Sequence, residues 1–194
     1  MATDDPAGED LRPAPDHPES IVLVGMMGSG KSTVGRHLAR ACGFAFVDCD
    51  KELERRSGVT ISTIFELEGE AGFRQREAKL LAELAVRPRT VLATGGGAVL
   101  LPENRRALRE HGLVIYLDAS ADELARRVAR DGSRPLLQVA DPRQRIRDLL
   151  LVRVPLYREA AHLTFRSGAS NPTRLVERIL RHPAVAAVVT RAAA

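Results

Sequence analysis

The chain has very little aromatic character. Tryptophan is absent, and aromatic residues make up only 4% of the 194 residues. A core built from this composition must be mostly aliphatic. Few rings are available to stack on the bases of a nucleic acid, which is how many single-strand binding proteins hold their ligand. The scarcity of aromatic residues therefore argues against a nucleic-acid binding module.

Cysteine is scarce as well. The two cysteines, Cys42 and Cys49, form no CxxC motif and have no histidine nearby at metal-binding spacing. This pattern predicts two small buried thiols in a reducing compartment, and it argues against a disulfide framework or a structural zinc site.

Long hydrophobic runs and an export signal are also missing. No apolar run approaches the roughly 20 residues needed to span a bilayer. The N-terminus lacks a basic segment followed by an apolar one, which is the pattern of a signal peptide. We therefore expect a cytoplasmic protein with no membrane partner. The length predicts one domain with a core of useful size.

Charge is distributed unevenly along the chain. Residues 1–20 hold six acidic residues against a single arginine, a net −5, which leaves +9 for the rest of a chain whose total is +4. The prolines and acids of residues 1–19 predict a disordered tail, and residues 183–194 are expected to form a C-terminal tail. The basic remainder suits anionic ligands, whether nucleic acid or small phosphates and carboxylates.

The most informative motif is a phosphate-binding loop. The stretch Gly25-Met-Met-Gly-Ser-Gly-Lys-Ser32 fits the pattern G-x-x-x-x-G-K-S/T, between a predicted strand at 21–24 and a predicted helix at 33–42. This geometry directs backbone N–H groups and a helix N-terminus at one point, where a polyphosphate can bind. Lys31 is expected to contact the β- and γ-phosphates, and the Ser32 hydroxyl to bind Mg²⁺. The motif predicts a nucleoside triphosphate site.

Strands and helices are predicted to alternate along residues 20–182. Further strands are expected at 44–47, 91–94, 113–117 and 163–165, with helices at 51–56, 60–68 and 70–86 and others from Pro102, Ser120 and Asn171. This order and the phosphate loop predict an α/β protein: a three-layer α/β/α P-loop fold with a five-stranded parallel sheet and helices on both faces. Residues 130–147 are polar, rich in arginine and broken by prolines, which predicts a mobile lid.

Two polar segments are expected to share one edge of this sheet. Asp48 and Asp50 follow the second strand, and Gly95 to Gly97 follow the third. Ligands of open parallel sheets bind outside the carboxyl ends of the strands, where the phosphate loop also lies. One carboxylate can therefore face the metal and phosphates, while the other faces an acceptor hydroxyl. The alternative interpretation, a turn and a helix cap, fits one of the two aspartates better than both of them beside a nucleotide site.

At these residues the chain resembles the shikimate kinase family, over about residues 20 to 180. The matching pieces occur in the order and spacing of that family: Gly-Met-Met-Gly-Ser-Gly-Lys-Ser-Thr33, Asp48-Cys-Asp50, Gly72-Phe-Arg74 with Glu77, Thr94-Gly-Gly-Gly97, Arg134-Pro-Leu-Leu137 and Arg153-Val-Pro-Leu-Tyr157. The phosphate loop is shared by many NTPases, whereas the combined set is specific. The resemblance implies transfer of the γ-phosphate of ATP, with Mg²⁺, to the 3-hydroxyl of shikimate.

The resemblance also implies a role for individual residues. Catalytic roles fall on Lys31, Asp50 and Arg134, the last of these on the lid, and metal binding falls on Ser32 and Asp48. Nucleotide binding falls on Gly28, Ser29, Gly30, Lys31, Ser32, Thr33, Arg127, Arg134 and Pro172. Substrate binding falls on Asp50, Arg74, Gly96, Gly97 and Arg153. The first two lie in the expected acceptor-binding region at 48–86, and the two arginines would clamp a carboxylate. Glu77 is expected to support an arginine.

Some features depart from the family or remain open. Ser170 stands where many members have an arginine that touches ATP. Asp118 ends a strand that resembles a Walker B strand, but it leads directly into a helix start, and we expect it not to act in catalysis. We expect a monomer whose partners are ATP and shikimate. The alternatives are a gluconate kinase or an adenylate kinase relative, an ATP-dependent nucleic-acid binding module suggested by a pI near 9.6, and an inactive paralogue.

Overall fold

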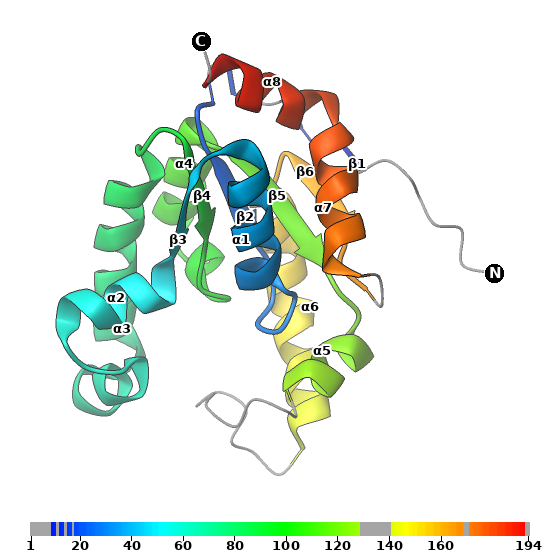
Figure 1. Cartoon of the computed structure of the whole chain (residues 1–194). Helices are drawn as coiled ribbons and strands as arrows, with labels where there is room; N and C mark the ends of the chain where they lie inside the picture. Colours follow the sequence, from blue (N-terminus) through cyan, green and yellow to red (C-terminus); the bar gives the residue numbers. More distant parts are fainter. Residues whose placement is uncertain are drawn as a thin grey trace.

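The computed structural model describes residues 9–10, 12–13, 15–16, 18–128, 141–168 and 171–192. A single sheet with strand order β1-β6-β5-β2-β4-β3 forms the middle layer (Figure 1). Its strands are β1 (Glu9–Asp10), β2 (Ile21–Val24), β3 (Ala45–Asp48), β4 (Thr90–Ala93), β5 (Leu113–Asp118) and β6 (Leu163–Arg166). Strands β2 to β6 are parallel, and β1 is antiparallel to β6. The predicted five-stranded parallel sheet is confirmed, with one short edge strand added.

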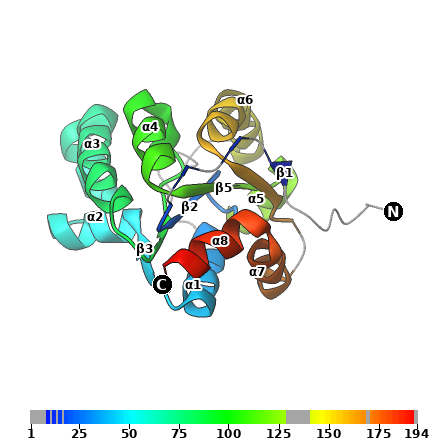
Figure 2. The same ribbon diagram turned by 90° about the horizontal axis from the view of Figure 1, so that it is seen from above.

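Helices cover both faces of the sheet. They are α1 (Lys31–Cys42), α2 (Cys49–Ser57), α3 (Ile61–Ala85), α4 (Pro102–His111), α5 (Ala121–Val128), α6 (Pro142–Ala160), α7 (Pro172–Arg181) and α8 (Pro183–Arg191), with a short 3₁₀ helix η1 (Ala98–Leu100). Figure 2 shows α3, α4 and α6 on one side of the sheet and α1, α7 and α8 on the other. Among the described residues, no helix is both long enough and apolar enough to cross a bilayer.

The strand β2 shows why the fold has two cores. All four of its side chains are buried. Because side chains alternate along a strand, Val22 and Val24 join the cluster under α3, α4 and α6, while Ile21 and Leu23 join the cluster under α1, α7 and α8. A strand covered on both faces must be apolar throughout. This burial anchors the start of the phosphate loop.

Both predicted tails contain ordered structure, which corrects the domain prediction. Glu9 and Asp10 pair with Thr164 and Leu163. Composition could not reveal this, because the pairing uses backbone groups at the open edge of β6. Residues 183–191 form helix α8, where Val185 and Val188 are fully buried. The one-turn spacing of these valines lets them face the same core.

Two element boundaries differ from the prediction. The strand β3 ends at Asp48, so Asp50 lies in the first turn of α2. The predicted break between the helices at 60–68 and 70–86 is confirmed, because α3 is interrupted at Gly69, where φ is 69°. Residues 142–147 of the predicted lid begin α6, whose N-cap Asp141 accepts a hydrogen bond from the Gln144 backbone. Pro142 therefore starts a helix, as proline does well in the first turn. The remaining lid residues up to 140, with Arg134, lie outside the described residues.

Candidate active site

The phosphate loop lies between β2 and α1, as predicted. Gly25, Gly28 and Gly30 have φ of 145°, 80° and 96°. An added Cβ at Gly25 would lie 2.7 Å from the Leu117 carbonyl oxygen, and one at Gly28 would lie 2.9 Å from the Val128 side chain. Only glycine combines these backbone angles with such close contacts. The loop therefore presents bare backbone to a ligand.

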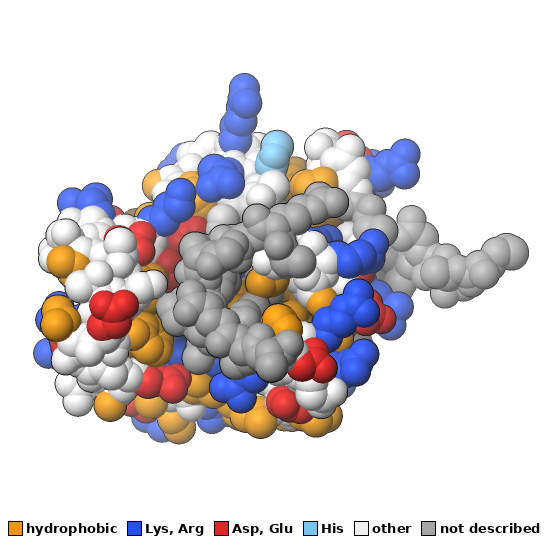
Figure 3. Space-filling view, turned by 90° about the horizontal axis from the view of Figure 1, so that it is seen from below, with side chains coloured by type: hydrophobic (Ala, Val, Ile, Leu, Met, Phe, Trp, Pro, Cys, Tyr) orange, Lys and Arg blue, Asp and Glu red, His pale blue; other side chains and the backbone are white. Residues whose placement is uncertain are grey.

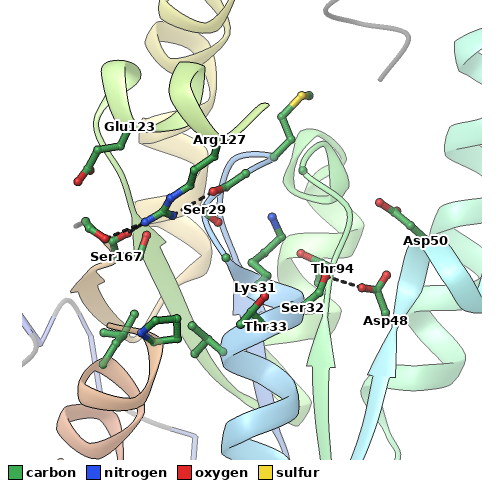
Figure 4. A pocket seen from close by; sticks show the side chains of 18 of the residues that line it. Ser29, Lys31, Ser32, Thr33, Asp48, Asp50, Thr94, Glu123, Arg127 and Ser167 are labelled. Carbon is green, nitrogen blue, oxygen red and sulfur yellow. Dashed lines mark hydrogen bonds between the residues drawn. The ribbon is translucent and has the colours of Figure 1, made fainter. Parts of the chain in front are cut away.

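The Lys31 ammonium is held on the loop itself. The side chain is buried, and Nζ donates hydrogen bonds to the carbonyl oxygens of Gly25 at 2.8 Å and Met26 at 2.9 Å. These bonds fold the lysine over the turn, at the edge of the cavity into which it points in Figure 4. A cation in this position can reach phosphate oxygens with little movement.

The next residue, Ser32, is paired with the end of β3. Its Oγ donates a hydrogen bond to Asp48 Oδ2 at 2.6 Å (Figure 4). Two oxygen atoms are thus held together beside Lys31. Magnesium bound with a nucleotide commonly takes one or two protein oxygens and fills its other positions with phosphates and waters. No group of three or more His, Cys, Asp or Glu side chains in the described part of the chain could hold a metal. The residues present therefore fit Mg²⁺ carried with a nucleotide.

A cavity of about 730 Å³ extends from the loop toward α5 and α7. Arg127 of α5 forms part of its wall and donates hydrogen bonds to the carbonyl oxygens of Gly28 at 3.1 Å, Ser167 at 2.8 Å and Gly168 at 2.7 Å. These bonds hold the guanidinium flat against two loops, with Pro172 also lining the cavity. Viewed from below, Lys and Arg side chains gather on the flank of α5 and α7 (Figure 3). This cavity has the size and charge to hold a nucleotide.

A second cavity, of about 460 Å³, adjoins the first. The two share Met27, Ser32, Asp48, Asp50 and Gly96 in their walls. Asp50 projects from the first turn of α2 at this junction (Figure 4). A group bound at the phosphate loop and a second ligand would therefore meet beside the Asp50 carboxylate.

Two arginines project into the second cavity. Arg74 of α3 donates to Glu77 Oε2 at 2.6 Å and to Glu70 Oε1 at 3.1 Å. Its Nε is buried with no hydrogen-bond partner among the described residues, and so is Glu77 Oε1. Burial raises the pKa of Glu77, and the nearby charge of Arg74 opposes this. This pair therefore keeps hydrogen-bonding capacity for a ligand or for water.

Arg153 of α6 lacks such a carboxylate. Only 3% of it is exposed, yet in the described ranges no carboxylate oxygen lies within 4.0 Å of its side-chain nitrogens. Its Nη1 is 3.4 Å from the Gly96 carbonyl oxygen and 3.9 Å from Met26 Sδ. A buried cation without a direct ion pair is costly. The charge of Arg153 opposes the rise that burial causes in the pKa of Glu77, but Glu77 is hydrogen-bonded to Arg74 instead. An anionic ligand in this cavity would supply the missing charge.

The glycine turn after β4 closes the second cavity. An added Cβ at Gly97 would collide with the Arg74 guanidinium, and one at Gly95 would lie 2.6 Å from Glu77 Oε1 and 2.8 Å from Asp50 Oδ1. The Tyr157 hydroxyl donates to the Gly96 carbonyl oxygen at 2.5 Å and holds the turn in place. The missing side chains at Gly95 and Gly97 therefore leave room for the protein's own charged groups.

All predicted site residues within the described ranges line one of the two cavities. Asp118 lines neither, and its carboxylate accepts a hydrogen bond from the Tyr116 hydroxyl at 3.0 Å. Arg134 and Ser170 lie outside the described residues.

Sequence reasoning missed other lining residues. They include Met27, Phe65, Phe73, Glu123 and Gly168. Met27 and Phe73 had a signal, because both belong to the pieces that match the family. Glu123 also forms a capping box with Ser120, in which each residue accepts a hydrogen bond from the backbone of the other.

The fold and these cavities define the class of protein. A phosphate loop, a nucleotide-sized cavity and an adjoining acceptor cavity with a carboxylate at the junction are the parts of a P-loop phosphotransferase.

Comparisons with known proteins identify the family within this class. A family model described as shikimate kinase matches residues 27–183. A shikimate kinase of Bordetella avium (strain 197N) is 57% identical over 164 residues, which cover 84% of this chain and 78% of the relative. The chain belongs to the shikimate kinase family.

Solved structures agree with this assignment. A shikimate kinase from Acinetobacter baumannii in complex with shikimate has a TM-score of 0.83 and 50% identity, covering 84% of this chain and 92% of the other. A gluconokinase from Sinorhizobium meliloti 1021 has a TM-score of 0.52 and 21% identity, covering 90% of this chain and 93% of the other. The second match shows a shared fold only.

Proposed function

We propose that this enzyme transfers the γ-phosphate of ATP to the 3-hydroxyl of shikimate and produces shikimate 3-phosphate and ADP. The observation that carries this proposal is the buried Arg153, which has no carboxylate partner among the described residues and lines the acceptor cavity. Shikimate carries a carboxylate and three hydroxyl groups. It can therefore pair with a guanidinium at one end and present a hydroxyl to Asp50 at the other.

The acceptor is held at its carboxylate by Arg153 and Arg74. A guanidinium offers two parallel N–H groups, which match the two oxygens of a carboxylate. Glu77 positions Arg74 through the 2.6 Å hydrogen bond between them. Gly96 and Gly97 bring backbone against the bound acid. Phe65 and Phe73 line the same cavity and provide apolar contact for the face of a carbon ring.

The nucleotide occupies the first cavity. Its phosphates lie on the loop formed by Gly28, Ser29, Gly30 and the start of α1 through Thr33, and its adenine lies between Arg127 and Pro172. Ser32 and Asp48 hold Mg²⁺, which neutralises phosphate charge when bound. Arg134 of the predicted lid completes this set by closing over the phosphates, and it remains a prediction.

Transfer then takes place at the junction of the two cavities. Lys31 stabilises charge on the γ-phosphate, and Asp50 orients the 3-hydroxyl and accepts its proton as the oxygen attacks phosphorus. Phosphoryl transfer depends chiefly on positioning and on charge stabilisation, both of which these residues supply.

One chain builds both cavities, which supports action as a monomer. The two thiols show no disulfide, and a substrate such as ATP suits the cytoplasm. We expect neither a nucleic acid nor a membrane as partner, since the charged groups of the site are gathered in cavities sized for small molecules.

An ADP-release assay with shikimate, gluconate and AMP as separate acceptors tests this proposal. We expect release with shikimate alone, and a decrease of about a hundredfold or more in turnover for Lys31→Met, because a preorganised charge at a developing anion is lost. Circular dichroism of the variant checks its fold. Equal or faster release with gluconate or AMP would contradict the proposed acceptor.

A further inference from the structure

A third cavity, of about 450 Å³, lies between α4 and α6. The two helices lie side by side when the molecule is seen from above (Figure 2). The cavity is lined by Arg105, Arg106, Arg109 and His162, with Pro13 and Pro15 on another wall. It shares no lining residue with the two cavities of the active site. His162 directly precedes β6, so the cavity lies toward the start of the parallel strands, whereas the active site lies where they end.

The arginines supply more positive charge than their neighbours neutralise. Arg105 is paired with Glu159 at 2.8 Å and also donates to the Val99 carbonyl oxygen at 2.8 Å. In the part of the chain that the structure describes, no carboxylate oxygen lies within 4.0 Å of the Arg106 or Arg109 side-chain nitrogens, although Glu110 also lines the cavity. Arg109 Nε is buried without a hydrogen-bond partner there. Two guanidinium groups therefore remain available beside the ion pair.

His162 adds a neutral donor. Only 3% of the residue is exposed, and Nδ1 accepts a hydrogen bond from the Val114 backbone N–H at 3.0 Å. The proton of the neutral ring therefore lies on Nε2, which leaves an N–H group for a ligand. Burial, and then the charges of Arg109 and Arg12, lower the pKa of His162 to about 4. The ring is thus neutral at pH 7 and lies in a positive environment.

We propose that this cavity is a second anion site, separate from catalysis, that binds a phosphate group. Arg106 and Arg109 would hold its oxygens through their forked N–H groups, and His162 Nε2–H would complete the contacts. Guanidinium groups and neutral N–H donors are the usual partners of phosphate in proteins. A cavity of about 450 Å³ is large enough for inorganic phosphate or for the phosphate end of a small metabolite.

The test uses the histidine ring as its own reporter. Full-length protein with ¹⁵N-labelled histidine is titrated with inorganic phosphate, and in parallel with a sugar phosphate, at constant ionic strength. We expect the His162 ring signals to shift and saturate, and the pKa of His162 to rise by about one unit, because a bound anion stabilises the charged ring. A response to one titrant alone identifies the source of the phosphate group.

Variants separate this site from the phosphate loop, which can also bind phosphate. Arg106→Gln with Arg109→Gln should weaken the His162 response by about tenfold or more, whereas Arg40→Gln, an exposed arginine on α1, should leave it unchanged. Lys31→Ala should also leave it unchanged, so the result does not depend on the proposed function. Arg106→Gln alone, at an exposed position, should give a partial loss if the double variant fails to fold. The proposal would be overturned if the His162 ring signals did not shift with either titrant, or if they shifted as much in the arginine variants as in the wild type.

Discussion

At the residue scale, the structure separates two aspartates near the ends of strands, Asp50 just after β3 and Asp118 as the last residue of β5. Asp50 lies where the two cavities of the active site meet. Asp118 lines neither and accepts a hydrogen bond from Tyr116. The first turn of α2 brings Asp50 to this junction, whereas Asp118 stays at the end of β5.

This contrast predicts opposite results for two matched substitutions. Asp50→Asn removes the base and the charge, so turnover should fall by about a hundredfold or more while ATP binding survives. Asp118→Asn keeps an oxygen that can accept from Tyr116, so turnover should stay within about twofold of wild type. Steady-state kinetics and ATP titration measure both variants. Loss of turnover in Asp118→Asn, with turnover unchanged in Asp50→Asn, would place the catalytic carboxylate at the end of β5 instead.

At the scale of elements, the glycine turn after β4 determines where Arg74 can lie. Gly97→Ala would drive a Cβ into the Arg74 guanidinium. The Michaelis constant for shikimate should therefore rise by about tenfold or more, and that for ATP should change little, because a displaced guanidinium loses its forked contact.

Gly43→Ala is the control for a general effect of alanine. Gly43 has φ of 67° and no heavy atom within 4 Å of an added Cβ. Its replacement should cost about 1 kcal/mol of stability through backbone strain and leave both Michaelis constants unchanged. Equal kinetics for Gly97→Ala and wild type would contradict the role assigned to the turn.

The elements also show what a sequence can and cannot predict. The strands β2 and β5 were predictable because β2 is apolar throughout and β5 is a continuous hydrophobic run up to Asp118, and the glycine motif predicted the loop between β2 and α1. The start of α2 was partly predictable, because Asp48 is its N-cap and accepts a hydrogen bond from the Lys51 backbone, as the helix-cap interpretation allowed. The third cavity was missed because His162 is distant in sequence from Arg106 and Arg109, and each of the three residues is ordinary by itself.

At the scale of the whole molecule, His162 predicts how stability depends on pH. The pKa of His162 is lowered to about 4 from an ordinary 6.5, so between these values the unfolded chain binds more protons than the folded chain. Stability is therefore fully present above pH 6.5 and is lost as the pH falls toward 4, by up to about 1.4 kcal/mol per pH unit. The carboxylates of Glu52 and Glu83 are ion-paired and have pKa values of about 2. Their protonation therefore lowers stability only below about pH 4.5, whereas that of His162 lowers it already above that pH.

Urea unfolding between pH 7 and pH 5 in phosphate-free buffer measures this loss. His162→Asn offers an acceptor for the Val114 N–H without a titrating group, so its stability should change much less over the same range. An equal pH dependence for the variant and the wild type would assign the loss to other groups.

Both ends of the described chain contribute to the fold at this scale. Both lie in segments predicted as tails, the N-terminal one because of its prolines and acidic residues: they are the edge strand β1 and the helix α8. Burial of Val185 and Val188, and backbone pairing with β6, are decided only once the rest of the sheet exists. Tertiary context of this kind overrides local composition.

The central claim is that Arg153 pairs with the carboxylate of the acceptor. The most direct measurement compares shikimate with its methyl ester in wild type and in Arg153→Gln, with kcat/KM determined for all four combinations. For the wild type, kcat/KM should be about tenfold or more lower with the ester than with shikimate. For Arg153→Gln, kcat/KM should be almost the same with both substrates, because the substitution and the esterification remove the two sides of one contact. Equal losses on esterification in both proteins would show that the carboxylate binds elsewhere.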